Sequence, residues 1–105
     1  MCNRKKSVVF QMQQKIETLV ESYDAKLLYF QYYKKTFGNI VIEIEKEKDI
    51  FTFILDRSDI ICNGKSSIDG LTRTIKCIPR EQYQENAYIQ LLEFINEILR
   101  KNLEK

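Results

Sequence analysis

Residues 37–65 read FGNIVIEIEKEKDIFTFILDRSDIICNGK and carry the clearest pattern of the chain. Within 40–45, isoleucine occupies every even position, and Val41, Glu43 and Glu45 lie between. Side chains of a strand point alternately to its two faces, so this spacing predicts a strand with one buried and one wet face. The stretch therefore predicts part of an antiparallel sheet.

The residues that follow predict a meander. Polar residues 46–49 predict the loop of a hairpin, and its return strand, 50–55, is apolar enough to occupy a central position. Residues 56–59 predict a second turn. Connections this short place successive strands side by side and antiparallel.

The last part of the predicted sheet contains two further turn signals. Asn63-Gly64 is a favoured pair for a two-residue hairpin and predicts a tight turn between strands at 60–62 and 66–68. Asp69-Gly70 predicts another turn, and residues 71–78 then predict one more strand. The meander is therefore expected to have four to five strands.

Both ends of the chain show helical spacing. Apolar residues recur every three or four positions over 7–23, where Ser7 is a suitable N-cap, and again beyond Pro79. The start of the second helix is open between Glu81 and a helix capped by Asn86. The predicted fold class is α+β: an N-terminal helix, an antiparallel meander of four to five strands and a C-terminal helix, in two layers.

Length and composition indicate one domain, 1–105. The chain has 105 residues, 44% hydrophobic and 30% charged, with a net charge of +2. Residues 1–6 are expected to be disordered.

No run of about 18 apolar residues is present, so we expect no membrane span. The basic N-terminus also lacks the apolar region of a signal peptide. The expected location is cytoplasmic.

The chain contains no histidine, which excludes Ser-His and Cys-His nucleophile pairs. Cys2, Cys62 and Cys77 have no zinc-ligand spacing, and reduced thiols are the expected state. We therefore expect no enzymatic activity, no metal and no cofactor. A carboxylate or magnesium site near Asp56 and Asp59 is an alternative, although aspartates in turns usually bond to their own backbone.

Acidic residues define a first candidate surface. Glu43, Glu45 and Glu47, followed by Asp49, Asp56 and Asp59, are predicted to form one negative patch that docks a basic protein partner. The alternative is a solvated sheet face with no partner.

Tyrosines define a second candidate surface. The aromatic residues 26–36 predict a strand with Tyr29 and Tyr33 on one face and Phe30 and Tyr32 on the other. Because tyrosine is enriched at interfaces, we hypothesise that Tyr29 or Tyr33 anchors a partner protein. Core and edge packing is the alternative, and pairing of this edge strand with a second copy would give a homodimer.

Basic residues near the aromatic strand raise a third hypothesis, a single-stranded nucleic-acid site. They are Lys34, Lys35, Arg73, Lys76 and Arg80. The acids of the neighbouring hairpin would repel phosphate, so nucleic acid is disfavoured as a partner.

Residues 37–65 resemble small bacterial immunity proteins of polymorphic toxin systems. The resemblance lies in Gly38-Asn39 before a strand, the Asp56-Arg57 turn and the Asn63-Gly64 pair, and covers less than a third of the chain. It implies a non-catalytic cytoplasmic protein that binds and neutralises one cognate toxin domain. The strand over 71–78 has no counterpart in the resemblance. A phage-encoded inhibitor of a host defence protein, or a small nucleic-acid-binding module, is the alternative function.

Overall fold

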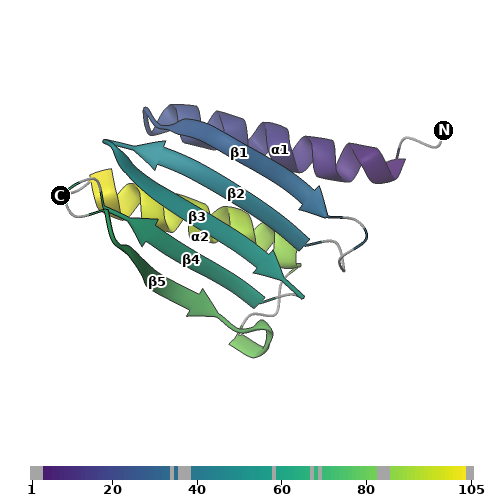
Figure 1. Cartoon of the computed structure of the whole chain (residues 1–105). Coiled ribbons are helices and arrows are strands. Elements are labelled where there is room, and N and C mark those ends of the chain that lie inside the picture. The colour runs from purple at the N-terminus through teal and green to yellow at the C-terminus, as the bar shows by residue number, and fades with distance from the viewer. Residues whose placement is uncertain are drawn as a thin grey trace.

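The computed structural model describes residues 4–33, 35, 39–57, 59–66, 68, 70–82 and 86–103. It confirms the predicted α+β fold, with a helix, a five-stranded antiparallel meander and a second helix (Figure 1). The elements are α1 (Arg4–Ser22), β1 (Lys26–Tyr33), β2 (Asn39–Lys46), β3 (Asp49–Asp56), β4 (Asp59–Lys65), β5 (Thr72–Ile78), a short 3-10 helix (Arg80–Gln82) and α2 (Ala87–Leu103).

The strands lie in the order β1-β2-β3-β4-β5, each antiparallel to its neighbours in the sequence. The apolar strand β3 is the central one, as its composition predicted. A bulge between Leu27 and Tyr29 interrupts the edge strand β1, and a second irregularity lies in the pairing of β4 with β5. Edge strands with bulges pair less readily with further strands.

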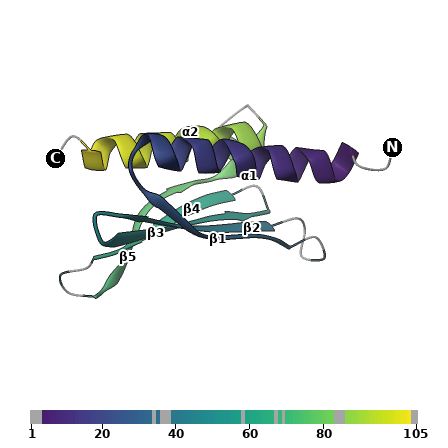
Figure 2. The same ribbon diagram turned by 90° about the horizontal axis from the view of Figure 1, so that it is seen from above.

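Both helices cover the same face of the sheet (Figure 2). The core lies between the two layers and includes Ile42, Phe53, Phe94 and Leu99, all almost fully buried. A hydrogen bond of 2.6 Å from the Tyr23 hydroxyl to Asn96 Oδ1 joins the end of α1 to α2. No helix within the described residues is long and apolar enough to cross a bilayer.

The helix boundaries differ from the expected ones at the N-terminal end. α1 begins at Arg4, so residues 4–6 of the segment expected to be disordered are helical, and Ser7 lies inside the helix and not at its cap. Residues 1–3 are outside the described part of the chain. At α2 the Asn86 alternative is confirmed, because Asn86 Oδ1 accepts the Tyr88 N–H at 2.7 Å.

The predicted turn at Asn63-Gly64 is wrong. Both residues lie within β4, and the connection to β5 runs from Ser66 to Leu71 instead. Packing explains why residue 64 is a glycine, because a Cβ there would lie 2.6 Å from Ile75 Cδ1 of β5. The positive φ that a tight turn favours occurs at Gly70, with φ 69°. Consequently, Ser66 and Ile68 do not lie in the return strand that we predicted, and residue 67 is outside the described part of the chain.

Candidate binding face

The face of the sheet opposite the helices, termed the open face below, is not covered by any element of the described chain (Figure 2). On β2 the isoleucines are fully buried against the helices, and Val41, Glu43 and Glu45 are half-buried on the open face. The strand register arranges the open-face residues of all five strands in rows across the sheet.

The middle row is an apolar stripe. Val41 is opposite Ile54, Ile54 is opposite Ile61, and Ile61 is opposite Cys77. The first three side chains are half-buried only by their neighbours in the sheet, and Cys77 is exposed. Apolar surface of this kind gains free energy when a partner removes it from water. Sequence reasoning did not identify this stripe.

The next row places tyrosine beside acid. Tyr29 of β1 is directly opposite Glu43 of β2, and the Tyr29 and Tyr33 hydroxyl oxygens are 2.9 Å apart. This hydrogen bond with Tyr33 raises the pKa of Tyr29, and slight desolvation and the negative charge of Glu43 raise it further. Both rings remain about 40% exposed (41% and 39%). The two surfaces predicted separately from tyrosines and acids therefore meet on one face.

Glu45 lies on the same face in a row of mixed charge. It is opposite Lys26 on one side and Ile50 on the other, and Ile50 is opposite Lys65. Cross-strand neighbours of opposite charge partly neutralise one another. Glu43, whose cross-strand neighbours are Tyr29 and Thr52, therefore has no basic residue opposite it.

Glu47 does not belong to the open face. It lies in the β2–β3 turn with Lys48, at φ 53° and 75° respectively. Its carboxylate is 3.3 Å from Lys46 Nζ, and Lys46 points to the helix side, where only 3% of it is exposed. Because an unpaired buried ammonium is strongly disfavoured, we infer that Glu47 compensates this charge.

Asp56 and Asp59 lie at the other end of the sheet. Asp56 Oδ1 accepts a hydrogen bond from Asn39 Nδ2 at 3.2 Å, and Asp59 Oδ1 accepts the Arg80 N–H at 2.9 Å. Asp56 lies six positions along β3 from Ile50, the residue opposite Glu45, which is about 20 Å at the usual rise of a strand. The acids therefore do not form the single patch that we predicted.

Two of the predicted basic residues, Lys76 and Arg73, do not lie beside the tyrosines, and exposed Lys35 follows Tyr33 by two residues beyond the end of β1. Lys76 points to the helix side, 3.6 Å from Glu97 and 5.8 Å from the centre of the Phe94 ring. Arg73 is on β5, at the opposite edge of the sheet from β1. Lys34 lies outside the described residues. Lys76 and Arg73 therefore cannot contribute to a nucleic-acid site built on the open-face tyrosines.

The two described cysteines have contrasting environments. Cys62 is fully buried in the core and Cys77 is exposed on the open face, and neither forms a disulfide. Burial raises the pKa of the Cys62 thiol from 9.0 to about 12. As the pH rises, the thiol ionises in the unfolded chain before it ionises in the folded protein. The contribution of the neutral Cys62 thiol to the free energy of unfolding is therefore complete below pH 9 and is lost between pH 9 and about 12.

We predict that Cys62 resists thiol reagents in the folded protein. Only the thiolate reacts, and three pKa units lower its fraction about a thousandfold at pH 8. With Cys2→Ser and Cys77→Ser, labelling of Cys62 by a chromogenic disulfide should follow global unfolding. A Cys2→Ser and Cys62→Val variant, which retains Cys77, should react within the mixing time. Native labelling of Cys62 as fast as that of Cys77 would contradict the buried placement.

Among the described residues, no group of three or more Cys, Asp or Glu side chains is arranged to hold a metal ion. Comparison of the chain with protein-family models, with curated proteins and with solved structures gave no match.

Proposed function

We propose that this protein is a non-catalytic binding protein of the immunity or inhibitor type, which neutralises a cognate toxin domain by docking its open face on it. The observation that carries the proposal is the composition of that face. An apolar stripe (Val41, Ile54, Ile61) lies directly beside two exposed tyrosines and Glu43. Interfaces combine an apolar centre with tyrosine anchors and a polar rim in the same way.

The chemistry of the face also favours one kind of partner surface. Glu43 and the hydroxyls of Tyr29 and Tyr33 present hydrogen-bond acceptors close together, and Glu43 has no basic cross-strand neighbour. A basic side chain of the partner, arginine above all, would pair with the carboxylate and stack on a tyrosine ring. The partner is therefore expected to present cations around an apolar patch. The identification of the partner as a toxin rests on the resemblance of residues 37–65 to small bacterial immunity proteins.

A growth assay with the neighbouring gene tests this proposal. The gene product encoded beside this protein is expressed in a bacterial host, alone and together with this protein. We expect the neighbour to arrest growth, this protein to restore it, and the two to elute as one complex with equal stoichiometry. Restored growth at a large excess of toxin over this protein would indicate turnover and contradict stoichiometric binding.

A homodimer formed by pairing of the edge strand β1 with β1 of a second copy is a separate prediction. Light scattering of the isolated protein measures its mass directly, and a mass of 12.6 kDa would identify a monomer. The bulge in β1 interrupts the regular ladder that a continuous intermolecular sheet would extend.

A further inference from the structure

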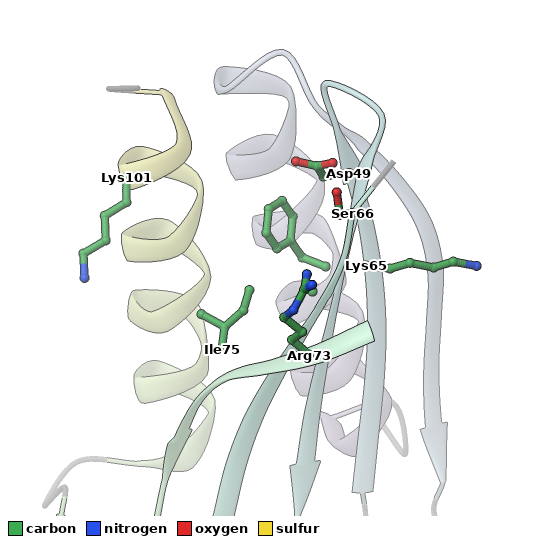
Figure 3. A pocket seen from close by; sticks show the side chains of 8 residues that line it. Asp49, Lys65, Ser66, Arg73, Ile75 and Lys101 are labelled. Atoms are coloured by element: carbon green, nitrogen blue, oxygen red, sulfur yellow. The ribbon is translucent and has the colours of Figure 1, made fainter. Parts of the chain in front are cut away.

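The open face carries opposite charges at equivalent positions on the two sides of its central strand, β3. Glu45 of β2 and Lys65 of β4 are both cross-strand neighbours of Ile50, one on each side of it. Lys65 is exposed, and its side chain extends away from α2 (Figure 3). Neither of the cross-strand neighbours of Lys65, Ile50 and Thr72, carries a charge. Lys65 therefore has no acid opposite it in its own sheet.

The apolar stripe has the same symmetry about β3. Ile54 of β3 lies between Val41 of β2 and Ile61 of β4, and all three side chains are half-buried. A rotation of 180° about an axis along β3 exchanges the positions of β2 and β4. The rotation therefore brings apolar residues onto apolar residues, and it brings acid onto base.

We propose that the open face binds the open face of a second copy of this chain, and that the two-fold axis of the dimer runs parallel to β3. Ile54 then lies against Ile54 of the second copy on the axis. Val41 contacts Ile61 of the second copy, and Glu45 pairs with Lys65 of the second copy, each twice. An isologous interface is self-complementary in this way. Two sheets with nearly aligned strands pack face to face about 10 Å apart, which long side chains can span.

Glu45 can accept this second cation because a carboxylate has two oxygens and about four acceptor positions. Its neighbour within the sheet, Lys26, lies on the edge strand β1. In the dimer, β1 lies over β5 of the second copy, where the residue in this row is the uncharged Thr72. The pair that spans the interface is therefore Glu45 with Lys65.

The size of the open face predicts a reversible dimer. Five strands of seven or eight residues, about 4.8 Å apart with a rise of about 3.3 Å per residue, cover about 550 Å² per copy. The total of about 1,100 Å² is close to the lower limit of about 1,200 Å² for stable interfaces. We expect a Kd of about 10–100 µM.

This dimer differs from one formed by pairing of two β1 edges, which would leave both open faces exposed. It also does not depend on the proposed function, because it requires this protein alone. If a toxin partner docks on the open face, the second copy and the partner exclude one another, and this consequence alone rests on the proposed function.

Sedimentation equilibrium of the isolated protein at about 5–500 µM tests the dimer. The mass should rise with concentration from the 12.6 kDa of the monomer towards twice that value. Lys65→Glu opposes Glu45 with a like charge at two places and should raise the Kd at least about tenfold. Adding Glu45→Lys to Lys65→Glu exchanges the two charges and should return the Kd to within about threefold of its original value.

Lys15→Glu is the matched control, because it makes the same change of charge on the exposed surface of α1 in the helix layer. It should change the Kd by less than about twofold. Circular dichroism confirms that each variant is folded. A mass of 12.6 kDa at every concentration would overturn the proposal. So would a dimer that Lys65→Glu leaves intact, a folded double variant that remains monomeric, or equal weakening by Lys15→Glu and Lys65→Glu.

Discussion

Replacing Phe53 with alanine is expected to lower the free energy of unfolding by about 3–5 kcal/mol. Phe53 lies on the central strand β3, is fully buried and packs edge-to-face on Phe94 of α2, with ring centroids 5.7 Å apart. Truncation removes the buried ring and leaves a cavity at the junction of the two layers. Since domains of this size are stable by only about 5–15 kcal/mol, much of the total would be lost.

Chemical and thermal unfolding measured by circular dichroism would reveal this change. The midpoint of thermal unfolding should fall by roughly 15 °C or more. Phe10→Ala is the matched control, because Phe10 of α1 is 58% exposed, and its stability change should stay within about 0.5 kcal/mol. Equal effects of the two substitutions would contradict the position of the core between the sheet and the helices.

Combining Tyr29→Ala with Glu43→Arg should raise the Kd for the neutralised partner at least about 100-fold. The first change removes an exposed aromatic anchor, and the second repels a partner whose surface is basic. Neither side chain contributes to the core, so the folded state should persist. Isothermal titration calorimetry with the partner, after its identification by the growth assay, measures the effect.

The matched control applies the same kinds of change to the helix layer. Phe10→Ala with Glu17→Arg removes an exposed ring and reverses an exposed charge on α1. This control should bind the partner with unchanged Kd. If the control abolishes binding and the open-face variant does not, the partner docks on the helices and the assignment of the open face is wrong.

Local patterns of the sequence predicted most of the fold. The alternation over residues 40–45 identified which side of β2 is buried, because side-chain direction in a strand depends only on position along it. The apolar composition of 50–55 indicated the central strand, and the capping chemistry of Asn86 made it one of the two predicted starts of α2. The Asn63-Gly64 pair gave a wrong turn prediction because glycine suits both a tight turn and a strand position where a neighbouring side chain leaves no room for a Cβ. Only the contact with Ile75 distinguishes them.

The candidate face depended on information that local patterns do not contain. That Tyr29 lies opposite Glu43 follows from the register of β1, which the bulge at Leu28 displaces by one residue. The apolar stripe joins residues of several strands, and it becomes visible only when the strands are aligned. The separation of Asp56 and Asp59 from Glu45 likewise follows from the pairing of the strands. Apolar residues at both odd and even positions of 50–55 were the available signal for the stripe.

The order of the strands has a consequence for how the chain folds. Each strand pairs only with its neighbours in the sequence, so every hairpin can close without waiting for a distant segment, and such chains fold faster than sheets with remote pairings. The helix layer joins the N-terminal and C-terminal parts of the described chain, through contacts such as that between Tyr23 and Asn96. We therefore expect the docking of α2 to be the late step that makes the transition cooperative.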